Sequence, residues 1–193
     1  AKPEREVILV EQSWTGAGAS GRNGGFCSYS LTHGFLNGYS RFKDEMAVIE
    51  RLGRENLDAI EATIKKYGID CDFEWNGEMR VAVEEWQLKG LKEEADLRNS
   101  FGDHVELLNQ EQVQARIKSP IYRGALWDPD GTALVDPARL VWGLERACIK
   151  LGVKIFENSH VERLERTKTG MIVHTPYGSV YANKVALATN VFK

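Results

Sequence analysis

The sequence predicts an α/β fold in which two outer segments share a mostly parallel sheet and the middle of the chain inserts an α+β segment. The apolar run Val7–Val10 lacks polar alternation, which is typical of a strand buried in a parallel sheet. After Asp136-Pro137, an amphipathic helix leads into a second predicted strand at Val153–Phe156, followed by a meander and a further apolar run. Between these segments, short strands and helices alternate in an order typical of an α+β module.

A carboxylate and a glycine-rich loop follow the first predicted strand. Glu11 comes directly after Val10, and residues 12–25 contain five glycines, which excludes regular structure there. A dinucleotide-binding fold places a carboxylate at such a strand end to contact a ribose, and glycines let backbone N–H groups approach phosphates. The alternatives are that Glu11 is a solvated strand-end acid and that the loop is only a connector.

The spacing of apolar residues predicts a long helix between Phe42 and Tyr67. Gly53 is expected to be a weak point or a kink in it, and Gly68 is a candidate C-terminal cap. Asn76-Gly77 lies between two strand-like runs and predicts a β-hairpin.

Helix-start signals are clear in the second half of the chain. Residues 84–100 have a helical pattern, and Asn109 is the expected N-cap of a helix over residues 110–116. Asp136-Pro137 is the clearest helix start, with Gly152 ending that helix. Strands are then predicted at residues 153–156, 161–164, 171–174 and 178–181, and Val185–Ala188 is predicted to be the last buried strand.

Composition narrows the function classes. The formal charge is −3, from 25 basic and 28 acidic residues, which argues against a nucleic-acid or anionic-membrane partner. The sequence contains neither a membrane-length apolar run nor a signal-peptide pattern. Its three cysteines are odd in number and far apart, so we expect no metal site or disulfide framework and a cytoplasmic location.

The motif Gly-Ala-Ser-Gly-Arg-Asn-Gly-Gly at residues 18–25 resembles the FAD-dependent amine and amino-acid oxidoreductases of the D-amino-acid oxidase, glycine oxidase and sarcosine oxidase superfamily. Ala188-Thr189-Asn190 is similar to the branch that contains γ-glutamylputrescine oxidoreductases. The resemblance implies a partial FAD-binding, Rossmann-like sheet of the glutathione-reductase type. It assigns residues 1–68 and 131–193 to the FAD-binding domain and residues 69–130 to part of a substrate-binding α+β domain.

The same resemblance implies roles for individual residues. Glu11 would accept the hydroxyls of the adenosine ribose, Gln12 would contact the adenosine side, and the backbone of Val161 would pair with the adenine edge. The loop that runs along the pyrophosphate to the isoalloxazine would consist of Ala19, Ser20, Arg22, Asn23, Gly24, Gly25 and Phe26. The strand end beside the phosphates would consist of Ala188, Thr189 and Asn190.

These assignments have structural alternatives. Arg22 is otherwise a surface charge or a structural ion pair, Val161 a core residue, and Thr189-Asn190 a strand-terminal turn. Cys27 lies near the residues expected to face the flavin, so a covalent flavin link is an alternative to an ordinary buried thiol.

The resemblance implies oxidation of a C–N bond in an amine or amino acid, by hydride transfer to FAD. It covers about half of such an enzyme, so the first βα unit and the C-terminal part are expected to lie outside this chain. The chain alone is therefore expected to bind FAD weakly or not at all, and its partners to be a small amine or amino-acid substrate, a second copy, or the remainder of the enzyme. The sequence nominates no catalytic residue.

Two other functions stay open at this stage. One is a fragment of an NAD(P)-linked dehydrogenase, because Glu11 would suit the ribose of NAD equally well. The other is a cofactor-free structural or interaction module derived from the same fold.

Overall fold

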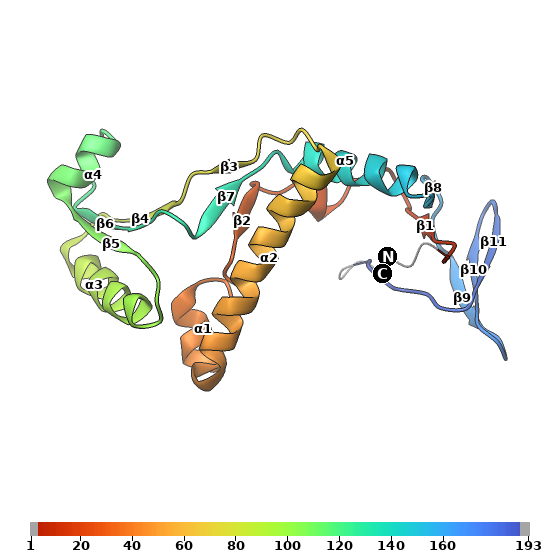
Figure 1. The fold of residues 1–193 in the computed structure, drawn as a ribbon, viewed down its shortest axis with the longest axis horizontal. Coiled ribbons are helices and arrows are strands. Elements are labelled where there is room, and N and C mark those ends of the chain that lie inside the picture. The colour runs from red at the N-terminus through yellow and green to blue at the C-terminus, as the bar shows by residue number, and fades with distance from the viewer. Residues whose placement is uncertain (1–3, 190–193) are drawn as a thin grey trace. The chain divides into compact units, whose positions relative to one another are not determined.

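A computed structural model describes residues 4–189, and Figure 1 shows its helices and strands. Its packing separates the chain into two compact units. One unit holds the residues up to Arg22 and those from Val141 onward, and the other is Asn23–Leu140. Parallel and antiparallel sheets occur together with helices, which confirms the α/β class. The boundaries proposed for an FAD-binding and a substrate-binding domain stay a prediction.

The first unit contains the expected parallel pair of strands. Strand β1 (Ile8–Val10) pairs with β8 (Lys154–Phe156), with Ile8 opposite Lys154 and Val10 opposite Phe156. Helix α5 (Pro137–Lys150) precedes β8, as the sequence predicts. The strands predicted at Val7–Val10 and Val153–Phe156 are therefore neighbouring parallel strands.

The same unit also holds an antiparallel sheet in the order β11–β10–β9. Its strands are β9 (Arg163–Arg166), β10 (Met171–Thr175) and β11 (Gly178–Ala182). The prediction of a buried strand at Val185–Ala188 is wrong, because this segment is not part of any described sheet and Leu187 is 71% exposed. An apolar β-branched run favours extended backbone, but a strand exists only where a neighbour takes its hydrogen bonds.

The second unit begins with a sheet in the order β2–β7–β3. Its strands are β2 (Phe26–Ser28), β3 (Glu74–Trp75) and β7 (Thr132–Leu134). Between β2 and β3 come helix α1 (Phe35–Arg41), the 3-10 turn Lys43–Glu45 and helix α2 (Met46–Tyr67). Gly68 caps α2 in the left-handed conformation, as predicted, whereas α2 continues through Gly53.

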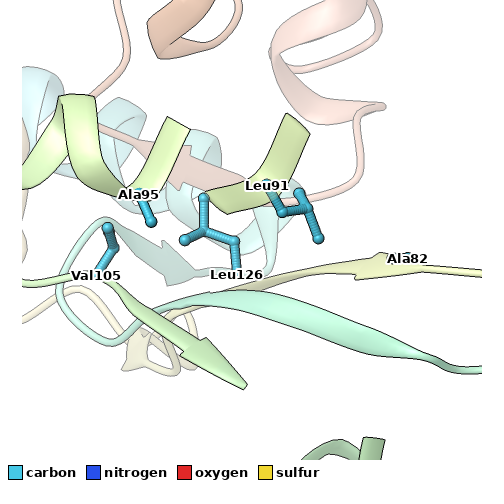
Figure 2. Packing of buried hydrophobic residues seen from close by; sticks show 5 residues of the cluster. All are labelled: Ala82, Leu91, Ala95, Val105 and Leu126. Carbon is cyan, nitrogen blue, oxygen red and sulfur yellow. The ribbon is translucent and has the colours of Figure 1, made fainter. Parts of the chain in front are cut away.

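The other sheet of this unit has the order β4–β6–β5, from strands β4 (Glu78–Ala82), β5 (Glu106–Asn109) and β6 (Gly124–Asp128). Helices α3 (Glu85–Ser100) and α4 (Gln110–Arg116) both pack on β6. Side chains alternate along a strand, so Leu126 joins the α3 cluster while Ala125 joins the α4 cluster. Figure 2 shows Leu126 with Leu91 and Ala95 of α3. The two helices therefore cover opposite faces of the sheet.

The Asn76-Gly77 turn does not close a hairpin, so that prediction is wrong. Strand β3 pairs with β7 and β4 pairs with β6, and the turn carries the chain from one sheet to the next. The Gly77 N–H donates to the Thr132 carbonyl at 3.0 Å, and Gly77 has a φ of +67°. The turn and both flanking strands are present, but each strand pairs with a strand other than the one predicted.

The predicted helix starts are confirmed. The Asn109 side chain accepts the Gln112 N–H at 2.9 Å, and the Asp136 carboxylate accepts the Arg139 N–H at 3.0 Å. None of the helices within residues 4–189 combines the length and apolar character needed to cross a membrane.

Candidate functional site

Glu11 directly follows the last residue of β1, and its backbone still hydrogen-bonds with the segment that contains β8. Its N–H donates to the Phe156 carbonyl at 2.9 Å, and its own carbonyl accepts the Ser159 N–H at 2.8 Å. The carboxylate Oε1 accepts the Ser13 N–H at 3.0 Å, which fixes the side chain of this half-buried residue. A carboxylate offers about four lone-pair positions, so acceptor capacity remains for the two hydroxyls of a ribose.

The loop after Glu11 is anchored at Thr15. Its N–H donates to Glu157 Oε1 at 2.6 Å, and its hydroxyl donates to Glu145 Oε1 at 3.0 Å. The Trp142 indole N–H donates to the Thr15 carbonyl at 3.1 Å. The backbone bond from Thr15 also lowers the pKa of Glu157. These bonds hold the start of the glycine-rich loop against the C-terminal part of the same unit.

The middle of the loop is a tight turn that leaves one side open. Residues Ala19–Gly21 form a 3-10 turn, and a Cβ at Gly21 would overlap the Gly16 carbonyl oxygen. A Cβ at Gly18 would meet nothing within 4 Å, so this backbone is open to a ligand. The Arg22 guanidinium lies 5.7 Å from the centre of the Trp14 ring. A cation–π contact uses none of the five guanidinium N–H donors in a hydrogen bond, so it leaves them available to an anion.

The second unit contains the rest of the predicted loop, Asn23–Phe26. Asn23 Oδ1 accepts the Gly25 N–H at 2.9 Å, and the Gly25 carbonyl accepts the Val135 N–H at 2.9 Å. Gly25 has a φ of +75°, and a Cβ there would overlap the Val135 carbonyl oxygen. Only glycine therefore fits this position. Phe26 begins β2 and is 72% exposed, so its ring is available for contact.

The remaining predicted cofactor residues belong to the first unit. The Gln12 side chain lies 3.3 Å from His160 Nδ1, and half-buried Val161 precedes β9. Thr189 is exposed, and Asn190 lies outside the described residues. The roles assigned to individual residues stay predictions.

Cys27 is part of β2 and is half-buried. Burial raises the pKa of its thiol. A protonated thiol is a poor nucleophile, so this environment favours the ordinary buried cysteine over a covalent flavin link.

The sequence analysis missed a group of buried charges in the second unit. Arg98 on α3 donates from Nε to Asp103 Oδ2 at 2.7 Å and from Nη2 to the Tyr29 hydroxyl at 2.6 Å, and it also forms an ion pair with Asp128. The Tyr29 hydroxyl donates to Asp103 Oδ2 at 2.9 Å. Arg54 on α2 forms an ion pair with Asp103, and its guanidinium lies 4.3 Å from the centre of the Tyr29 ring. Charge pairing and hydrogen bonds compensate the burial of these groups.

A cavity of about 370 Å³ adjoins this network. It is lined by residues of the Ser28–Asn37 segment, by Glu50 of α2, by Glu78 and Arg80 of β4, by Arg98 of α3, and by Asp128, Gly131 and Thr132. Its volume lies in the range of small-molecule sites in proteins. A binding site for a small polar molecule is therefore physically reasonable here.

Glu50 is the unusual member of the cavity wall. Its side chain lies on the buried face of α2 and is 8% exposed, and its Oε2 has no hydrogen-bond partner. Burial, together with the nearby Asp103 carboxylate, raises the pKa of Glu50 to about 7. The signal was present in the sequence, because Glu50 falls four residues after Met46 and seven before Leu57, within the apolar stripe of the helix.

Comparison with protein families gives a match over residues 1–192 to a family described as FAD dependent oxidoreductase. The chain belongs to this family of FAD-dependent oxidoreductases. Its glycine-rich loop and the carboxylate after β1 fit a cofactor that carries a ribose and a pyrophosphate. FAD is the cofactor of the family, which bears out the cofactor expected from the sequence.

Two curated relatives match nearly the whole of this chain. The probable oxidoreductase OrdL of Haemophilus influenzae is 31% identical, and the alignment covers 100% of this chain and 45% of the relative. Gamma-glutamylputrescine oxidoreductase of Escherichia coli is 33% identical, with 97% of this chain and 44% of the relative covered. The chain thus spans a little under half the length of these relatives.

Solved structures show the same fold. Glycine oxidase from Bacillus cereus superposes with a TM-score of 0.76 at 21% identity, covering 94% of this chain and 47% of that protein. L-proline dehydrogenase from P. horikoshii superposes with a TM-score of 0.70 at 18% identity, covering 93% and 45%. These similarities establish the architecture of the family for this chain.

Proposed function

We propose that the protein oxidises the C–N bond of an amine or amino acid with FAD as its electron acceptor. The observation that carries this proposal is the family match over residues 1–192, joined to the position of Glu11 directly after β1. The substrate class is supported by a relative named for γ-glutamylputrescine and by a similar structure named for glycine. Bound FAD would supply the two-electron oxidation, and water would convert the resulting imine into a carbonyl compound and either an amine or ammonia.

The residues of this chain would bind and orient the cofactor. Glu11 would accept the ribose hydroxyls with the carboxylate lone pairs that do not accept the Ser13 N–H. Arg22 would donate to the pyrophosphate while Trp14 holds its guanidinium. The open backbone at Gly18 would allow close approach of the phosphates. Gly25 and Phe26 would serve the flavin end.

We also propose that this chain is one part of such an enzyme. The support is the share of the relatives' length that it covers, 45% and 44%. Many of the contacts that hold FAD in a complete enzyme would then come from other segments. The isolated 193-residue chain is accordingly expected to retain little FAD.

The first test is the flavin content of the protein purified from cells, read from its visible absorbance and its intact mass. In the full-length protein, Glu11→Ala should lower FAD affinity by about tenfold or more, since a bidentate contact to the ribose is lost. Glu4→Ala changes an exposed acid before β1 and is the matched control. Equal FAD affinity in both variants would contradict the role of Glu11.

The second test is reduction of the bound flavin by amines in the absence of oxygen. Bleaching of the flavin band, with release of a carbonyl product, supports the proposed reaction. If the full-length protein holds FAD and is reduced by alcohols or hydroxy acids but by no amine, oxidation of the C–N bond is excluded.

A further inference from the structure

We propose that the cavity beside Glu50 binds the ammonium group of a small organic amine, with the carboxylates of Glu50 and Glu78 as its acceptors. The proposal concerns binding at one set of residues in the second unit. Its link to turnover, as a site that selects cationic substrates, rests on the proposed function.

The charges of the cavity wall that are not already paired within the protein are mainly negative. Arg98 is already paired with Asp103 and Asp128, and Arg80 with the 2%-exposed Glu94. Both cations are therefore committed to carboxylates of the protein. Anionic ligands would have to compete with those ion pairs, so the wall disfavours them.

Glu50 and Glu78 supply the uncommitted negative charge. Within residues 4–189 neither of them forms a salt bridge, and Glu78 Oε2 accepts only the Thr132 hydroxyl, at 3.2 Å. A buried carboxylate oxygen without a hydrogen-bond donor is costly, and the Oε2 of Glu50 is such an atom. An ammonium group in the cavity brings three N–H donors and a positive charge, which would compensate the negative charge of both carboxylates.

The ligand is expected to be an organic cation rather than a metal ion. Divalent metals require several oxygen or nitrogen ligands converging on one point. Among the residues that the structure describes, no group of three or more His, Cys, Asp or Glu side chains is placed to hold a metal. Phe35 and Leu36 add apolar surface to the cavity wall, which suits the carbon chain of an alkylammonium ion.

The packing of α2 explains why Glu50 stays in this position. Gly53 lies one turn after Glu50. A Cβ at Gly53 would overlap the Tyr29 carbonyl oxygen, so α2 and the backbone of Tyr29 approach closely there. Buried Met46 lies one turn before Glu50 on the same face of the helix. The helix therefore cannot rotate to bring Glu50 into solvent without breaking these contacts.

Binding of the cation should depend on pH through Glu50. Burial is the main cause that raises its pKa and Asp103 raises it further, while Arg54, Arg98 and the Tyr29 hydroxyl lower it, and the result is about 7. An alkylammonium ion stays protonated throughout the neutral range. Affinity should consequently rise about tenfold between about pH 6 and about pH 8, as Glu50 becomes ionised.

The experiment is calorimetric titration of the purified protein with n-butylammonium chloride, with n-butanol as the uncharged probe of similar shape. Wild type should bind butylammonium saturably and butanol much more weakly. Glu50→Gln should weaken butylammonium binding by about tenfold or more and abolish its pH dependence, and Glu78→Gln should weaken it as well. Glu106→Gln, on an exposed position of β5, is the matched control and should bind like wild type.

Three results would overturn the proposal: no saturable binding of butylammonium to wild type, equal affinity in Glu50→Gln, or equal binding of butanol. Circular dichroism of each variant confirms that it is folded. Flavin content and amine-dependent flavin reduction are measured on the full-length protein, because the 193-residue chain alone is expected to retain little FAD. Failure of those two measurements, with butylammonium binding intact, would refute the proposed function while leaving the cation site standing.

Discussion

Gly53 of α2 packs directly against the backbone of Tyr29. A Cβ at position 53 would overlap the Tyr29 carbonyl oxygen, although the helix itself is continuous from Met46 to Tyr67. This close approach brings Glu50, one turn before Gly53, to the buried charges around Tyr29. A residue that the sequence marks as a weak point in a helix is thus a point of close packing between α2 and the backbone of Tyr29.

Gly53→Ala should destabilise the protein by about 2 kcal/mol, because the added methyl group forces α2 away from the backbone of Tyr29. Gly90→Ala is the matched control, since Gly90 lies exposed in α3 with nothing within 4 Å of a Cβ. That variant should gain roughly 0.5–1 kcal/mol from helix propensity. Urea unfolding of both variants measures the difference, and equal gains in stability would show that no close contact exists at Gly53.

Arg98→Met should cost about 3 kcal/mol or more, because it leaves the largely buried Asp128 carboxylate without its cation and Asp103 with Arg54 alone. Arg51→Met breaks an exposed ion pair with Glu55 on α2 and should cost less than about 0.5 kcal/mol. Thermal unfolding compares the two substitutions. If both substitutions lowered the free energy of unfolding by a similarly small amount, the ion pairs of Arg98 would be exposed to solvent.

Glu50 should make the protein less stable as the pH rises. Its pKa in the folded protein is about 7, above the ordinary value of 4.5, so the folded state holds this proton more tightly than the unfolded chain. The favourable contribution is complete below the unfolded pKa and is lost as the pH rises through the folded one. Glu50→Gln should therefore be more stable than wild type at about pH 8, by roughly 3 kcal/mol.

The measurement is urea unfolding of wild type and Glu50→Gln at about pH 5 and about pH 8. Glu106→Gln serves again as the control and should follow the wild-type pH dependence. A difference between wild type and Glu50→Gln that does not change with pH would contradict a raised pKa for Glu50.

Local chemistry determined the helix ends. The Asn109 and Asp136 side chains accept backbone N–H groups three residues later, and Gly68 adopts the left-handed conformation that ends α2. Each signal acts within one helical turn, so a short stretch of sequence contains all the atoms involved. The glycine-rich loop after β1 was predictable for the same reason.

Strand partners were decided by the tertiary structure. The segments around Asn76-Gly77 are both strands, as predicted, but each hydrogen-bonds with a strand more than forty residues away rather than with the other. Val185–Ala188 has the pattern of a buried strand and no place in a described sheet. Backbone pairing requires a neighbour, and the apolar pattern of one segment contains no information about which neighbour is present.

The sequence by itself determined the family and the loop that would hold FAD, because that loop is a continuous motif in residues 18–25. Only the tertiary structure revealed the cavity with Glu50, since it joins side chains from α2, α3, β4 and the segment after β2. The ionisation of Glu50 depends on burial and on the Asp103 carboxylate, 53 positions further along the chain. Such an environment arises only when distant segments pack together.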